Sequence, residues 1–287
     1  MIIVKDNSFI LHTCNTSYIF HVMETGHLEH LYYGSKLDYV NAVDALIPKH
    51  INGNGCTVAY EKHENLCMNE IALEVSGKGT GDFRCPSREL EWEDGSSTVD
   101  FVFDSYEVLN DKYMLSALPS SYDETGQTQT LKIVLKEKHR KVKLELYYSL
   151  YEQADVITRS MVLRNEGEEN VQIKRFMSTQ LDIPGTDYVL TSFRGDWIKE
   201  MQRYDTPVNG QVVNMTHSGF SSNFANPFVM LFSERSGEDY GEGYAFNLLY
   251  SGAHQELAET GSYGQTRFLT GISPEGFSWN LKKTVLL

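Results

Sequence analysis

A tryptophan flanked by charged side chains is the residue of this sequence best suited to holding the flat apolar face of a ligand. Trp197 follows Arg194 and Asp196 in a segment that we expect to form a loop after a strand. An indole ring can stack on the C–H face of a sugar. The charged neighbours favour a position near water, although a lone tryptophan is often a core residue. The residues alone therefore leave a binding position and a core position open for Trp197.

Other ionisable residues indicate structure more than chemistry. Asp82 and Arg84 are two positions apart, so an extended segment places them on one side, where we expect an ion pair that fixes a loop; contact with a sugar is the alternative. No spacing typical of a glycosidase pair relates the carboxylates Asp182, Asp187, Asp196 and Glu200. The four cysteines and nine histidines follow no metal-ligand spacing, so we expect neither a metal nor a cofactor.

Composition excludes several classes of partner. The chain has 287 residues, 25 of them Lys or Arg and 39 Asp or Glu, which gives a formal charge of −14. Nucleic acids and anionic membrane surfaces both need clustered basic residues, so neither is expected as a partner. No run approaches the roughly 18 apolar residues of a membrane span. The N-terminus lacks the pattern of a signal peptide, so we expect a cytoplasmic protein with reduced cysteines.

Strands must position these residues, because apolar side chains alternate with polar ones in many short segments. Residues 142–150 alternate with a period of two, which predicts a strand with one wet face. Residues 156–163 carry apolar side chains on both sides of an extended segment, which predicts protein on both faces. Only residues 38–47 could supply one or two helical turns. Short strands separated by turn signals, without alternating helices, predict an all-β sandwich.

Several ordered strings resemble the N-terminal domain of glycoside hydrolase family 36, the bacterial α-galactosidases. They are Leu31-Tyr32-Tyr33-Gly34, Gly79-Thr80-Gly81-Asp82-Phe83-Arg84-Cys85-Pro86, Asp155-Val156-Ile157-Thr158-Arg159-Ser160, Arg194-Gly195-Asp196-Trp197-Ile198-Lys199-Glu200, Asn226-Pro227-Phe228, the segment 246–252 and Gly276-Phe277-Ser278-Trp279. The resemblance implies one two-sheet β-supersandwich domain over residues 1–287, with almost no helix. In the family, a (β/α)8 barrel carries both catalytic aspartates, in Lys-Trp-Asp and Ser-Asp motifs. This sequence has neither motif, so we expect an isolated, inactive N-terminal domain.

The resemblance also implies which residues contact substrate. The family's loop tryptophan faces the galactose pocket, and Trp197 is its match, with Arg194 and Asp196 beside it. In tetrameric members a loop matching residues 48–57 reaches a neighbouring subunit's active site, so His50 and Asn52 are expected substrate contacts in a homo-oligomer. This loop departs from the Arg-Leu-Asp pattern of those members. An exposed apolar surface is expected where the barrel would dock.

Three functions remain open at this point. The first is the non-catalytic domain of a retaining α-galactosidase, which releases galactose from galactosides such as melibiose and raffinose. The second is a stand-alone carbohydrate-binding sandwich. The third is an aldose epimerase, because those enzymes share the supersandwich architecture, but no His and Glu pair suited to that acid–base chemistry stands out in the sequence.

Overall fold

The computed structural model describes residues 1–38, 43–49, 58–115, 118–275 and 279–282. These residues are almost entirely strands and loops, which confirms the all-β prediction. Within the described ranges, helix is confined to α1 (Val43–Leu46), which lies within the segment predicted to form a turn or two, and to the 3-10 turns Met68–Glu70 and Glu152–Ala154. The chain divides into two compact units, Met1–Lys174 with Trp279–Leu287, and Arg175–Ser278.

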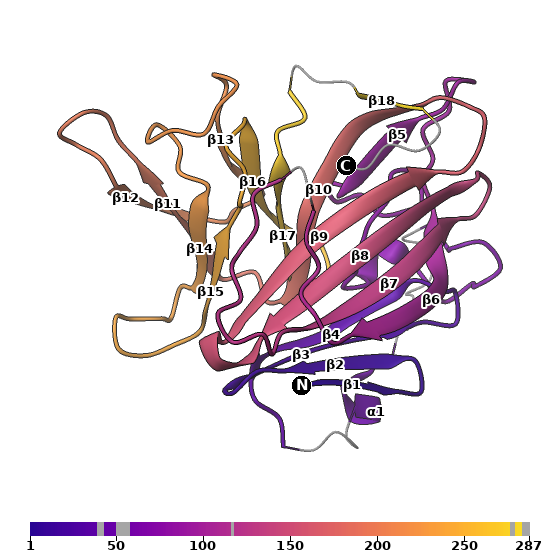
Figure 1. Cartoon of the computed structure of the whole chain (residues 1–287), viewed down its shortest axis with the longest axis horizontal. Coiled ribbons are helices and arrows are strands. Elements are labelled where there is room, and N and C mark those ends of the chain that lie inside the picture. Colours follow the sequence, from indigo (N-terminus) through magenta and orange to yellow (C-terminus); the bar gives the residue numbers. More distant parts are fainter. Residues whose placement is uncertain (39–42, 50–57, 116–117, 276–278, 283–287) are drawn as a thin grey trace. The chain divides into compact units, whose positions relative to one another are not determined.

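Two antiparallel four-stranded sheets make up most of the first unit (Figure 1). One sheet has the order β1-β2-β3-β4 and the other β6-β7-β8-β9. Consecutive strands pair antiparallel in both sheets, and the turn between β1 and β2 uses positive φ angles at Asp6 and Asn7. The strands of the first sheet are β1 (Ile2–Lys5), β2 (Ser8–His12), β3 (Thr16–Val22) and β4 (Leu28–Ser35). Those of the second are β6 (Phe101–Leu109), β7 (Gln129–Glu137), β8 (Val142–Tyr151) and β9 (Val156–Asn165).

The predicted wet face of the strand over residues 142–150 is wrong. Leu144, Leu146 and Tyr148 are buried as expected, but Glu145 and Tyr147 on the other face are buried too. Glu145 is stabilised there by Arg164, whose Nε lies 3.0 Å from its carboxylate, and by a hydrogen bond from the Tyr147 hydroxyl at 2.8 Å. The alternating pattern therefore located the strand, but it did not show that both faces of the strand are buried.

The second unit contains the remaining sheets. β12 (Gln202–Pro207), β11 (Tyr188–Arg194), β14 (Phe228–Ser233) and β15 (Gly243–Asn247) form one antiparallel sheet in that order. β13 (Gln211–Met215), β16 (His254–Thr260), β17 (Gln265–Ile272) and the C-terminal part of β10 (Val171–Pro184) form the other. β10 starts in the first unit, where it pairs with β18 (Trp279–Leu281) and β5 (Arg88–Glu91).

Three structural features bear on the remaining expectations. Among the described residues, Cys14, Cys67 and Cys85 form no disulfide, while Cys56 lies outside that part of the chain. In the part of the chain that the structure describes, no cluster of His, Cys, Asp or Glu could hold a metal ion. No helix among those residues is long and apolar enough to cross a membrane.

Candidate functional site

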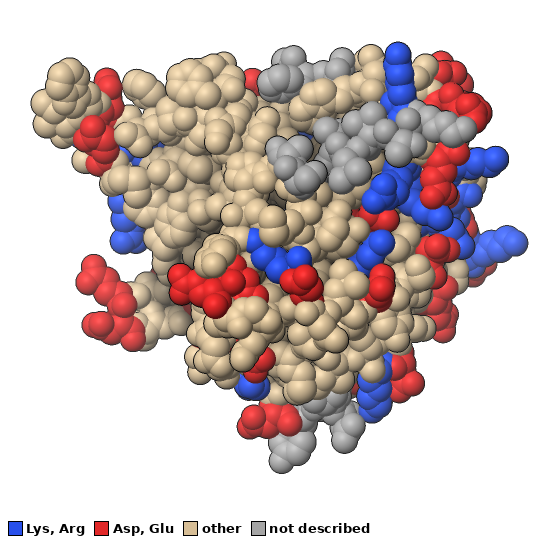
Figure 2. Space-filling view, in the orientation of Figure 1, with Lys and Arg blue, Asp and Glu red and all other residues tan. Residues whose placement is uncertain are grey.

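The loop between β11 and β12 carries Trp197 at the surface of the second unit. The ladder of these strands ends at the pair Arg194 and Gln202, and the chain reverses between them. Gly195 allows the close turn, because a Cβ there would lie 2.0 Å from the carbonyl oxygen of Lys199. The Trp197 side chain is 83% exposed, which excludes a core position. In Figure 2 the tip of this hairpin is mostly uncharged, with acidic side chains beside it.

Acidic side chains shape this loop from within. The Asp196 carboxylate accepts a hydrogen bond from the Trp197 main-chain N–H at 2.6 Å, and the Asp196 carbonyl accepts one from Lys199 at 2.8 Å. The Glu200 carboxylate accepts a hydrogen bond from the Ile198 N–H at 3.2 Å. Ile198 is 81% exposed and has a φ of 67°, a conformation that costs energy for a β-branched residue. The loop therefore presents apolar side chains outward.

Asn226 holds the base of this loop. Its main-chain N–H donates to the Phe193 carbonyl at 3.0 Å, where β11 ends, and its side-chain amide contacts the Met201 sulfur at 3.4 Å, where β12 is about to begin. Its side-chain oxygen accepts from the Phe228 N–H at 2.9 Å, at the start of β14. One asparagine thus connects both ends of the Trp197 loop to the neighbouring strand.

A buried polar cluster lies behind Asn226. The Asn214 side-chain amide donates to the Asn226 carbonyl at 2.9 Å and to the Glu256 carboxylate at 2.8 Å. Glu256 also lies 3.0 Å from His254 Nδ1, while His254 Nε2 lies 3.0 Å from the carbonyl oxygen of Ala225. Burial raises the pKa of Glu256, and the favourable interactions with His254 and Asn214 offset this only in part. This interior cluster supports the segment that positions the loop.

The structure places the predicted site residues unevenly. Trp197, Arg194 and Asp196 are exposed on one hairpin, and the Asp196 carboxylate is engaged in shaping the loop. His50 and Asn52 lie outside the described residues, so their predicted role stays a prediction. Sequence analysis missed Asn226 as the support of the loop, although it belongs to one of the strings that carried the family resemblance.

The Asp82 and Arg84 pair is structural, as expected. Arg84 Nε lies 2.8 Å from the Asp82 carboxylate, and both side chains are almost fully buried. The same guanidinium donates to the carbonyl oxygens of Met68 at 2.9 Å and Ile71 at 2.7 Å. These bonds fix the Gly81–Arg84 segment against the 3-10 turn at Met68, which leaves the Arg84 guanidinium committed to the protein interior.

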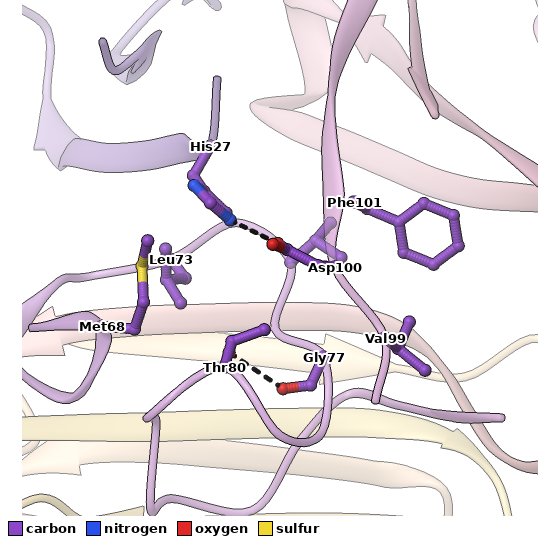
Figure 3. Close-up of a pocket in the computed structure, with 9 residues that line it drawn as sticks. His27, Met68, Leu73, Gly77, Thr80, Val99, Asp100 and Phe101 are labelled. Atoms are coloured by element: carbon purple, nitrogen blue, oxygen red, sulfur yellow. Dashed lines mark hydrogen bonds and ion pairs between the residues drawn. The ribbon is translucent and has the colours of Figure 1, made fainter. Parts of the chain in front are cut away.

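A small cavity in the first unit lies beside a second polar cluster (Figure 3). His27 Nε2 is 2.8 Å from the Asp100 carboxylate, which also accepts a hydrogen bond from Tyr60 at 2.7 Å. The cavity has room for about one water molecule. It cannot admit a sugar ring, so this His and Asp pair does not form a site for sugar chemistry.

The buried His and Glu pairs give no support to an epimerase. His30 Nδ1 lies 2.8 Å from Glu74, and His254 Nδ1 lies 3.0 Å from Glu256, but each pair is enclosed by protein. General acid–base catalysis requires the acid and base to reach the substrate's protons. In the described residues these pairs serve packing and hydrogen bonding.

Replacing Trp197 by alanine should change the free energy of unfolding by less than about 0.5 kcal/mol, as for other exposed side chains. The matched control is Trp92→Ala, because Trp92 is buried and its indole N–H donates to the Thr98 carbonyl at 3.0 Å. Truncating a core aromatic costs about 3–5 kcal/mol. Urea denaturation of both variants measures the contrast, and a loss of several kcal/mol for Trp197→Ala would contradict an exposed site residue.

Known proteins resemble this chain along nearly its whole length. The family model for the glycosyl hydrolase family 36 N-terminal domain matches residues 26–282. The bifunctional alpha-galactosidase/sucrose kinase AgaSK of Mediterraneibacter gnavus is 33% identical, over 95% of this chain and 29% of its own. Alpha-galactosidase Mel36A of Lactobacillus acidophilus is 31% identical, over 96% of this chain and 38% of its own. The chain thus spans well under half the length of these relatives.

Solved structures agree with these matches. The crystal structure of the alpha-galactosidase from Lactobacillus brevis shares 32% identity and a TM-score of 0.93, covering 99% of this chain and 39% of that one. A variant of the alpha-galactosidase AgaA from Geobacillus stearothermophilus, solved in complex with raffinose, shares 29% identity and a TM-score of 0.92, covering 98% of this chain and 39% of that one.

Proposed function

Because this chain belongs to the N-terminal domain family of the family 36 glycosyl hydrolases, we propose that it is the non-catalytic N-terminal domain of a retaining α-galactosidase. The four sheets would group into the two layers of one β-supersandwich spanning residues 1–287. The TM-score of 0.93 with a crystallised alpha-galactosidase, over 99% of this chain, supports a fold shared with that enzyme. We further propose a cytoplasmic location and self-association.

The proposed role of the domain is to wall one side of a galactose pocket. The observation that carries it is the exposed Trp197 indole on a loop preformed by Asp196, Glu200 and Asn226. An indole held in this way can stack on the apolar face of galactose without ordering the loop on binding. Arg194 and Asp196 would lie beside the sugar, and His50 and Asn52 would contact substrate from the 48–57 loop, here or in a neighbouring subunit.

The chemistry of such an enzyme needs two carboxyl groups. One attacks the anomeric carbon and displaces the leaving oxygen, which the second protonates; the second then activates the water that hydrolyses the glycosyl-enzyme intermediate. In the proposal both belong to a catalytic barrel, which needs roughly 250 residues of its own. The barrel would dock on apolar surface of this domain and complete the pocket around Trp197.

The chain alone should not hydrolyse nitrophenyl α-galactoside above a buffer blank, since it supplies only one wall of the pocket. Galactose and raffinose should bind weakly, because the Trp197 indole alone cannot enclose most of a ligand. Titration followed by tryptophan fluorescence checks this, with Trp197→Ala as the variant that should remove the response, although Trp92 and Trp279 still fluoresce in it.

These measurements, together with a polarimetric assay, distinguish the proposed function from the other two. Tight sugar binding by the isolated chain would favour a stand-alone carbohydrate-binding module. Polarimetric detection of anomer interconversion would favour an epimerase. Turnover of the nitrophenyl substrate that survives repurification would overturn the assignment of catalysis to residues outside this chain.

A further inference from the structure

β12 is an edge strand whose residues are all exposed. It lies at one end of the sheet order β12-β11-β14-β15, and each residue from Gln202 to Pro207 is open to solvent. An edge strand offers a row of main-chain N–H and C=O groups to which another strand can add. What joins such an edge depends on which groups point outward and on the side chains that flank them.

The hydrogen-bonding pattern shows which groups point outward. The Val208 N–H donates to the Tyr188 carbonyl at 2.9 Å, and the register of β11 and β12 places these two residues opposite each other. In an antiparallel ladder, hydrogen-bonded pairs alternate with non-hydrogen-bonded ones. The main-chain groups of Tyr204 therefore face β11, while those of Arg203 and Asp205 face the open edge.

We propose that β12 pairs antiparallel with β12 of a second copy of this chain, centred on Tyr204. In this two-fold register Arg203 lies opposite Asp205 of the partner copy, and Asp205 lies opposite Arg203 of the partner copy. The outward N–H and C=O groups of each such pair then exchange hydrogen bonds. The interface is isologous, with the same strand contributed by both copies.

The side chains are complementary in the same register. Arg203 and Asp205 lie on one face of β12, since Arg203 Nε donates to the Asp205 carboxylate at 2.9 Å. Pairing would gather two arginines and two aspartates into an alternating cluster on that face. On the other face the Tyr204 rings, each 52% exposed, would meet across the two-fold axis. Cross-strand pairs of opposite charge and of aromatic rings both stabilise a sheet.

Charged residues and a proline on an edge can also protect it from pairing, and Pro207 stands at the end of β12. Protection is effective when like charges meet, whereas antiparallel self-pairing here brings opposite charges together. Pro207 lies outside the central pairs, so it limits the length of the added ladder without blocking it. Because the strand is short, the interface falls below the roughly 1,600 Å² of a standard one, and the dimer should be weak.

This inference deepens the self-association proposed above by naming its surface, and its test is separate from sugar binding. Sedimentation velocity over a wide concentration range should show a reversible dimer of the unaltered chain. Arg203→Glu and Asp205→Arg should each raise the dissociation constant about tenfold, because each places two pairs of like charges across the axis.

An equimolar mixture of the two variants supplies the decisive measurement. In a heterodimer, the glutamate introduced by Arg203→Glu lies opposite the arginine introduced by Asp205→Arg. Asp205 of the first variant lies opposite Arg203 of the second. Both contacts are attractive, so the mixture should dimerise as tightly as the unaltered chain, which neither variant does alone. The matched control is Lys136→Glu, which reverses a charge in the exposed pair of Lys136 with Asp104 and should leave the dimer unchanged.

Three outcomes would overturn the inference: a chain that stays monomeric at high concentration, a dimer that both variants leave intact, and a mixture that fails to recover the dimer. The second outcome would leave self-association through another surface standing. Circular dichroism checks that the variants fold. Should a charge reversal prevent folding, Arg203→Gln and Asp205→Asn replace it, and each should weaken the dimer about threefold.

Discussion

Replacing Glu74 by alanine should lower the free energy of unfolding by about 3–5 kcal/mol, the usual cost of removing one partner from a buried ion pair. Glu74 is fully buried in the first unit. Its carboxylate accepts hydrogen bonds from Tyr18 at 2.6 Å and Tyr148 at 2.8 Å, and it lies 2.8 Å from His30 Nδ1 and 3.3 Å from Arg159. The variant leaves all of these groups buried with fewer partners.

The size of this effect follows from where the partners lie. Tyr18 and His30 belong to β3 and β4, whereas Tyr148 and Arg159 belong to β8 and β9. Glu74 therefore connects the two sheets of the first unit through one side chain. The matched control is Glu166→Ala, since Glu166 forms an exposed ion pair with Lys143 at 3.2 Å. Such pairs contribute about 0–1 kcal/mol.

The Glu74 effect should depend on pH in a defined direction. Burial alone would raise the pKa of Glu74, but Arg159 together with the hydrogen bonds from His30 and Tyr18 lowers it below its ordinary value of 4.5. A carboxyl whose pKa is lower in the folded state adds stability above its unfolded pKa, and this stability is lost as the pH falls through the folded pKa. The difference between wild type and Glu74→Gln should therefore shrink below about pH 4.5.

Urea denaturation at neutral and acidic pH measures both effects. A loss below about 1 kcal/mol for Glu74→Ala at neutral pH, comparable to the Glu166→Ala control, would show that the hydrogen bonds and ion pair of Glu74 contribute little to the free energy of unfolding.

Replacing Asp182 by alanine should cost about 3–5 kcal/mol in the second unit for the same physical reason. Asp182 on β10 lies directly opposite Arg267 on β17. Arg267 Nε donates to one carboxylate oxygen at 2.8 Å and Nη2 to the other at 2.7 Å, and both side chains are fully buried. The substitution would leave a guanidinium charge in the interior without this carboxylate.

A double substitution shows whether Asp182→Ala is unstable because it leaves the Arg267 charge buried without its carboxylate, here called a stranded charge, or because it disturbs packing in general. Asp182→Leu combined with Arg267→Met removes both charges and keeps apolar volume, so it should recover most of the loss, because buried ion pairs often contribute little over an apolar replacement. The matched control is Asp187→Ala, whose partner Arg235 lies 3.5 Å away at the surface. Chemical denaturation compares the three. A double variant as unstable as Asp182→Ala would contradict the stranded-charge explanation.

Local sequence patterns determined the secondary structure of this protein. Alternation located β8, and apolar residues on both sides of the segment 156–163 located β9. The scarcity of helical periodicity predicted almost no helix, as the described residues show. The charged neighbours of Trp197 indicated a surface loop, and the side chain is indeed exposed. These features depend on residues within a few positions of one another, where spacing along the chain is spacing in the element.

Only the tertiary structure decided which polar residues are interior and what they hold. Alternation shows which side chains share a face of a strand, but it does not show whether that face is covered, and Glu145 is buried although its face was expected to be wet. Glu74 meets Tyr148 across 74 residues, and Asn214 meets Glu256 across 42. A buried carboxylate is stable only when hydrogen-bond donors surround it. Donors that lie far away in the chain cannot be identified from the spacing of residues in the sequence.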